Sequence, residues 1–127
     1  MEKEFVPYEL ALRMKALGYD EPCLALYING KFHLIFSEHQ LDTIALAPLF
    51  QQAFRWFRDE QGLKSWVQEH TISTFIYQIR PHILSHYKEG EIYVYKTFEE
   101  AELACLKKLI EIVEQTNAEM TDHGVYK

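Results

Sequence analysis

Histidine and cysteine have the most varied chemistry in this chain, which contains six and two of them. His82 and His86 are four residues apart, the spacing at which two histidines on a helix can bind one metal ion. However, they follow Pro81 between two strand-like segments, and no glutamate or cysteine stands at ligand spacing. On an extended segment the two rings would lie about 13 Å apart. We therefore expect exposed loop histidines and predict no metal site.

A cysteine and a histidine can together form a catalytic nucleophile, and Cys23 has His33 and His39 further along the chain. No local signature of a cysteine enzyme surrounds it, and it follows Pro22 at the start of a strand-like segment. Cys105 lies on the apolar side of a helical segment, where a free thiol behaves as a small hydrophobic group. We expect two free thiols that serve packing.

Three acids, Glu99, Glu100 and Glu102, resemble a catalytic cluster when taken alone. Thr97 followed by Glu100 is a capping box, and acids in a first helical turn interact favourably with the helix dipole. Helix initiation therefore accounts for all three. The sequence has no glycine-rich phosphate loop and no nucleophile elbow. It predicts no catalytic, cofactor-binding or metal-binding residue, which leaves an enzyme with a dispersed active site as an alternative.

Composition narrows the class of protein further. The 127 residues are 48% hydrophobic and 14% aromatic, with a formal net charge of −6. The basic residues are scattered, so binding to nucleic acid is not expected. A second alternative function is that of an acidic inhibitor that mimics nucleic acid, which would need its acids on one face. No apolar run approaches the roughly 18 residues that a membrane helix needs. The charged start lacks the pattern of a signal peptide, so we expect a cytoplasmic protein.

Periodicity predicts an α+β fold, with three helices on an antiparallel sheet in the order α-ββ-α-ββ(β)-α. The expected helices are 7–17, 48–61 and 97–115, and the expected strands are a hairpin over 24–36 around Asn29-Gly30, then 64–70, 74–80 and 91–95. Residues 43–46 fit either a loop or a short strand. We expect a single α+β domain over 1–115 and a disordered polar tail over 116–127.

Several apolar residues fit a contact surface as well as they fit a core. Trp56, Tyr93 and Tyr95 lie beside expected core positions, and exposed Trp and Tyr are typical anchors of protein interfaces. Leu103 and Ile110 lie about 120° from the main apolar stripe of the last helix, so another element or a partner must cover them. These five residues form the predicted interaction surface, for a protein partner or a homodimer.

Three helical segments together resemble a group of small proteins of gut Bacteroides-type bacteria, their phages and mobile elements. The segments are 5–11, 52–58 and 97–111. The resemblance implies the setting of a phage or mobile-element accessory protein, and it assigns no activity, cofactor or site residue. The predicted function is protein binding or self-association.

Overall fold

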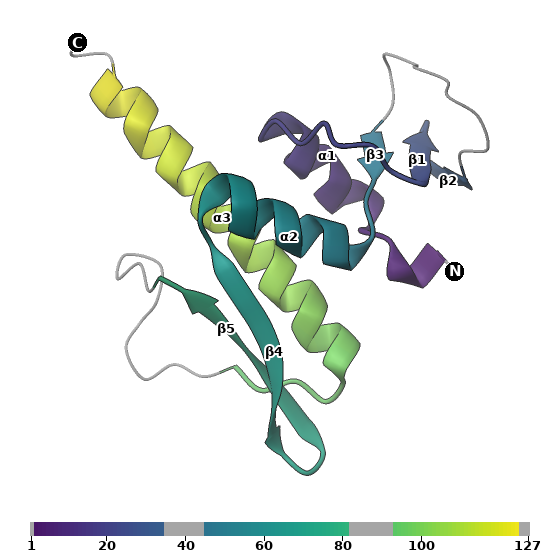
Figure 1. Cartoon of the computed structure of the whole chain (residues 1–127), viewed down its shortest axis with the longest axis vertical. Helices are drawn as coiled ribbons and strands as arrows, with labels where there is room; N and C mark the ends of the chain where they lie inside the picture. The colour runs from purple at the N-terminus through teal and green to yellow at the C-terminus, as the bar shows by residue number, and fades with distance from the viewer. Residues whose placement is uncertain (1, 35–44, 82–92, 125–127) are drawn as a thin grey trace. The chain divides into compact units, whose positions relative to one another are not determined.

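The computed structural model describes residues 2–34, 45–81 and 93–124, with side chains described as far as Met120. The chain divides into two compact units, Met1–Trp56 and Phe57–Lys127, which we describe separately. Figure 1 labels their helices and strands. The predicted single domain over 1–115 stays a prediction.

Unit 1 combines short helices with a three-stranded antiparallel sheet in the order β2-β1-β3. Asn29 and Gly30 connect β1 to β2 with φ angles of 52° and 78°, as a type I′ turn requires. The predicted hairpin is therefore confirmed, as is the first helix to within one residue at each end. The elements are η1 (Glu2–Glu4), α1 (Tyr8–Ala16), β1 (Ala25–Ile28), β2 (Lys31–Leu34), β3 (Ala45–Ala47) and α2 (Phe50–Gln61), whose last turns belong to unit 2.

The core of unit 1 includes both faces of β1. The alternation of the sequence predicts that Leu24, Leu26 and Ile28 share one face of this strand, but Leu24 precedes the strand and is 63% exposed. Ala25 and Tyr27 are buried instead, together with Leu26. The Tyr27 hydroxyl donates to the carbonyl of Val6 at 2.7 Å. Both edges of β1 are paired because it is the central strand, and the burial of consecutive residues means that both of its faces are covered as well.

Helix α2 begins with a side-chain cap. The Leu49 amide donates to Oε1 of Gln52 at 3.0 Å, which satisfies one of the free amides at the helix start. Ala53 and Trp56 are buried within unit 1, and Phe57 is buried at the start of unit 2. Gly62 follows the helix with φ +70°, the left-handed conformation that ends many helices.

Unit 2 is a β-hairpin packed on a long helix (Figure 1). Its strands, β4 (Lys64–Thr71) and β5 (Thr74–Arg80), pair antiparallel, and α3 (Phe98–Gly124) contacts both of them. Both strands lie where the sequence predicts them. In the described part of the predicted strand 91–95, Tyr95 alone pairs, with Phe75 of β5.

Helix α3 confirms half of the predicted capping box. The Glu100 amide donates to Oγ1 of Thr97 at 3.1 Å, whereas the Glu100 carboxylate accepts from the amide of Lys96 and not from that of Thr97. The helix continues to Gly124, well past the expected end near Gln115. Between these two positions the sequence contains no glycine or proline that would stop a helix.

The structure therefore confirms an α+β fold with three α-helices and antiparallel strands in the predicted order. The strands form two separate sheets, and the short strand expected as an alternative at 43–46 is present as β3. Among the described residues, no helix combines the length and the apolar character needed to cross a bilayer.

Candidate interaction surface on the hairpin unit

The five residues predicted to form an interaction surface differ in exposure. Ile110 is fully buried and Trp56 is 4% exposed, with its ring packed edge-on against Tyr19 at 5.5 Å. Neither can present its side chain to a partner while the chain is folded. Leu103 and Tyr95 are half-buried, and Tyr93 is 60% exposed. An interaction surface must therefore be built around Tyr93 and Tyr95.

A pair of short backbone hydrogen bonds holds Tyr95 in place. The amides of Phe75 and Tyr95 each donate to the carbonyl of the other at 2.8 Å, so the segment before α3 runs antiparallel to β5. The Tyr95 ring lies 6.2 Å from that of Tyr77, and the Phe98 ring meets Phe75 edge-on at 6.1 Å. These four rings attach the first turn of α3 to the hairpin.

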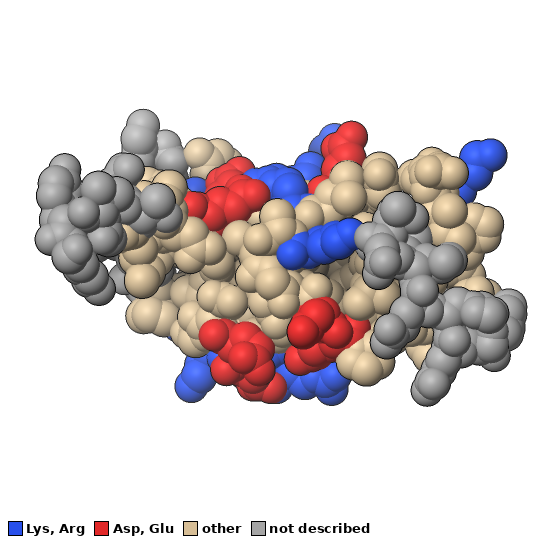
Figure 2. Space-filling model, turned by 90° about the horizontal axis from the view of Figure 1, so that it is seen from above, with Lys and Arg blue, Asp and Glu red and all other residues tan. Residues whose placement is uncertain are grey.

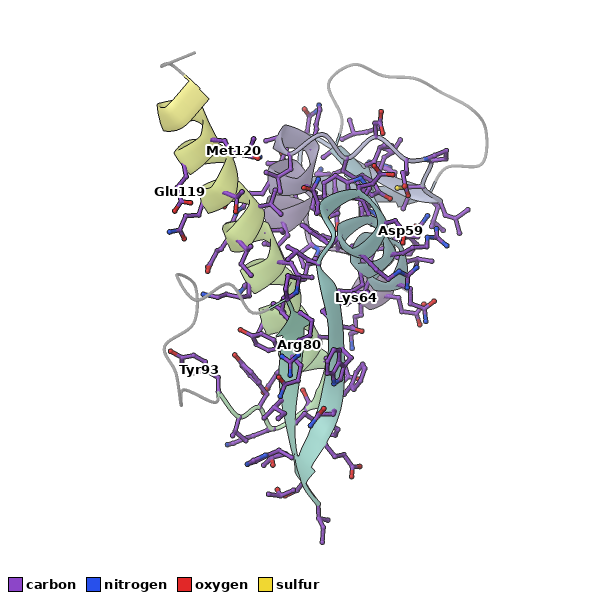
Figure 3. The ribbon with its side chains drawn as sticks, turned by 60° about the vertical axis from the view of Figure 1, so that its left-hand side comes forward. Asp59, Lys64, Arg80, Tyr93, Glu119 and Met120 are labelled. Carbon is purple, nitrogen blue, oxygen red and sulfur yellow. The ribbon has the colours of Figure 1, made fainter. Side chains whose placement is uncertain are left out.

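Four exposed apolar side chains belong to the segments that this aromatic cluster joins. Ile72 lies in the turn between β4 and β5 and is 99% exposed. Tyr93, Val94 and Phe98 are all more than 40% exposed, and Figure 3 shows Tyr93 directed away from the hairpin. Each of the four lies within three residues of Phe75 or Tyr95 in sequence. We call Ile72, Tyr93, Val94 and Phe98 the end patch.

Sequence reasoning identified only Tyr93 in the end patch. An isoleucine between Thr71 and Ser73, at a position where turns favour polar residues and glycine, was a signal that could have located Ile72. The spacing of Phe98 places it on the apolar stripe of the last helix, but at the first helical position little of the chain covers it. Val94 gave no comparable signal.

The opposite face of the hairpin carries Trp66 among polar side chains, together with the buried Ile76. Trp66 donates from Nε1 to Oε1 of Gln68 at 2.7 Å, and the Arg80 guanidinium lies 5.6 Å from the centre of its ring. Lys64 is directly opposite Arg80 in the strand register, and Figure 3 shows both on neighbouring strands. This face therefore keeps Trp66 within a set of polar contacts, unlike the end patch.

Burial disfavours the charged form of three titratable groups of unit 2. It raises the pKa of the Cys105 thiol to about 12, which a side-chain hydrogen bond with Ser65 only partly offsets. Burial, with a smaller contribution from Cys105, also raises the pKa of Tyr95. The pKa of Glu102 is raised by burial and then by the nearby charge of Glu99. All three shifts disfavour the charged form.

The cysteine of unit 1 is likewise unsuited to act as a nucleophile. Burial raises the pKa of Cys23 to about 11, and its thiol lies 3.4 Å from the hydroxyl of Tyr19 and 3.3 Å from the carbonyl of Glu21. His33 is exposed on β2. Thiolates are the reactive form of cysteine, so these surroundings favour the predicted packing role. Both cysteines are free, as expected.

Metal and nucleic-acid chemistry find little support in the described residues. No group of three or more His, Cys, Asp or Glu side chains gathers there in a way that could hold a metal ion. His39, His82 and His86 lie outside those residues. On the face drawn in Figure 2, acidic side chains lie next to basic ones and not in one acidic surface.

Comparison with family models, with curated proteins and with solved structures finds no match for this chain. The candidate site therefore rests on the geometry of unit 2 alone.

Proposed function

We propose that this chain is a small cytoplasmic accessory protein that acts by binding another protein, and that the end patch is the surface it uses. One observation carries the proposal. Among the described residues eight large apolar side chains are exposed, and four of them, Ile72, Tyr93, Val94 and Phe98, lie within three residues in sequence of the hydrogen-bonded pair Phe75 and Tyr95. Single exposed apolar residues are common, whereas a group of them is typical of a binding surface.

The composition of the end patch supports the same proposal. It contains two aromatic side chains, the residue class that supplies most binding energy at protein interfaces. The aromatic cluster behind it holds the segment before α3 against β5, so a partner would meet a pre-formed surface and little ordering entropy would be lost on binding. The setting of a phage or mobile element, which the three helical segments suggest, is part of this proposal.

The test is affinity capture from the organism that encodes the chain, with matched surface variants. We expect the double substitution Ile72→Ser and Val94→Ser to abolish capture of a partner that the wild-type chain recovers. Leu24→Ser is the control, because Leu24 is an exposed apolar residue of unit 1. Equal recovery by the wild type and the double variant would contradict the proposal, as would selective loss with Leu24→Ser.

A further inference from the structure

The hydrogen-bonding direction of each residue in β4 follows from the bond between Phe75 and Tyr95. In an antiparallel sheet the N–H and C=O of one residue point to the same side, and successive residues point to opposite sides. Phe75 directs both groups at Tyr95, and therefore away from β4. Residues 76, 78 and 80 then bond to β4, where their partners in the register are 68, 66 and 64.

The alternate residues of β4 must therefore direct their backbone groups away from the hairpin. These are Ser65, Val67 and Glu69. Among the described residues β4 pairs with β5 alone, so this row of donors and acceptors forms an open edge. The regular register ends after Glu69, where it shifts by one residue before Thr71. The open edge is thus a short regular segment centred on Val67.

We propose that the open edge of β4 binds β4 of a second copy of this chain, antiparallel and related by a two-fold axis through Val67. Directly opposite residues of a sheet lie on the same face, and side chains alternate between faces along each strand. A symmetric pair must therefore place odd-numbered residues of β4 opposite odd-numbered residues of the partner strand. With Val67 opposite the partner's Val67, Ser65 lies opposite the partner's Glu69. All three outward-facing residues then exchange backbone hydrogen bonds.

The residues of β4 are compatible with a second copy in this orientation. Lys64 lies opposite the partner's His70, Trp66 opposite the partner's Gln68, and Glu69 opposite the partner's Ser65. No two acids and no two lysines become directly opposite, so no like charges repel each other across the contact.

The packing of α3 leaves room for the second copy. Ser65, Val67 and Glu69 are on the same face of the hairpin as Phe75 and Ile79, the face that packs on α3. Two strands span about 10 Å, which matches the roughly 8–10 Å between the axes of packed helices. A four-stranded sheet made from two hairpins therefore provides the width that two α3 helices need.

Cysteine cross-linking tests both the contact and its register. Val67→Cys places two thiols on the two-fold axis, where the Cα atoms of a hydrogen-bonded pair are about 5.5 Å apart, within reach of a disulfide. Glu69→Cys is the matched control, because its two copies would lie four residues out of register, roughly 14 Å apart. We expect mild oxidation to convert Val67→Cys, and not Glu69→Cys, into a covalent dimer.

Light scattering of the unmodified chain supplies the second measurement, with the mass of two chains as the expected result. Val67→Pro removes an outward donor without breaking a bond to β5, so it should halve that mass, while Val67→Ala should not. If circular dichroism shows that Val67→Pro does not fold, the comparison of Glu69→Pro with Glu69→Ala replaces that of Val67→Pro with Val67→Ala. A wild-type monomer would refute the proposal, and so would a dimer that cross-links through Glu69→Cys or persists in the folded proline variant.

The test of dimer formation can be separated from the test of partner binding, because the end-patch variant leaves the open edge of β4 intact. Ile72→Ser with Val94→Ser should remove partner capture and keep the mass of two chains. Val67→Pro should do the reverse.

Discussion

Glu102 is an acid whose pKa is shifted clearly, and the shift is upward. Burial is the larger cause and the charge of Glu99 the smaller. A carboxyl whose folded pKa exceeds its unfolded value destabilises the fold when ionised. That unfavourable contribution is present above the folded pKa and disappears as the pH falls below the unfolded pKa.

We therefore expect Glu102→Gln to raise the free energy of unfolding at pH 7 by a few tenths of a kcal/mol, as for other partly exposed sites. The gain should shrink as the pH is lowered until the wild-type carboxyl is protonated. Urea denaturation of the wild type and of Glu102→Gln at a series of pH values measures this difference in the free energy of unfolding. Glu99→Gln removes only the smaller cause and should give a smaller gain, so a larger one would contradict the assignment.

Cys23 leads to a second prediction at the scale of one residue. Its pKa of about 11, against an ordinary value of 9.0, leaves roughly a hundredfold less thiolate at pH 8. Alkylation of the folded chain by iodoacetamide should be slower than that of a model thiol by about this factor, and should accelerate as the pH rises. Rapid labelling of Cys23 at pH 8, located by peptide mass spectrometry, would show that the thiol is activated.

Sequence alone predicted the chemistry of single residues better than their exposure. The packing role of both cysteines follows from residue type and local context, and their raised pKa values agree with it. The burial of Ile110 could not be predicted from helical periodicity, which places a residue on a face of a helix and does not say what covers that face. Phe98 shows the opposite effect, because a residue on the apolar stripe becomes exposed at the end of the helix.

At the scale of elements, the cap of α3 can be tested directly. Thr97→Ala removes the hydroxyl that accepts from the Glu100 amide, and should lower the free energy of unfolding by about 1 kcal/mol. Thr97→Ser keeps an acceptor and should cost much less. Chemical denaturation of the two variants measures the difference. Equal losses would mean that the methyl group, not the hydrogen bond, matters at this position.

The boundaries of most elements were predictable because local signals set them. Asn29-Gly30, the Thr97–Glu100 pair and Gly62 act through backbone geometry and one or two hydrogen bonds. Strand order was not predictable, because it depends on pairing between segments far apart in sequence. The pairing of β1 with β3, and of Phe75 with Tyr95, are two examples. The two segments that carry the end patch are joined only through the second of these.

At the scale of the whole molecule, the proposed pairing of β4 makes thermal stability depend on protein concentration. A partner that binds only the folded chain raises the midpoint of unfolding as its concentration rises. We expect the midpoint of the wild type to increase over a hundredfold range of concentration and that of Val67→Pro to stay constant. Differential scanning calorimetry measures both. A constant wild-type midpoint would argue against self-association.

The hydrogen bonds between Phe75 and Tyr95 have a further consequence, for how far such an assembly can grow. A hairpin with two open edges can add copies on both sides and extend into a filament. Here Tyr95 occupies the β5 edge at Phe75, and a two-fold contact uses the β4 edge of both chains at once. The two-fold symmetry closes the β4 contact after one step, so growth through β4 would stop at two copies, and Tyr95 would block further pairing at Phe75.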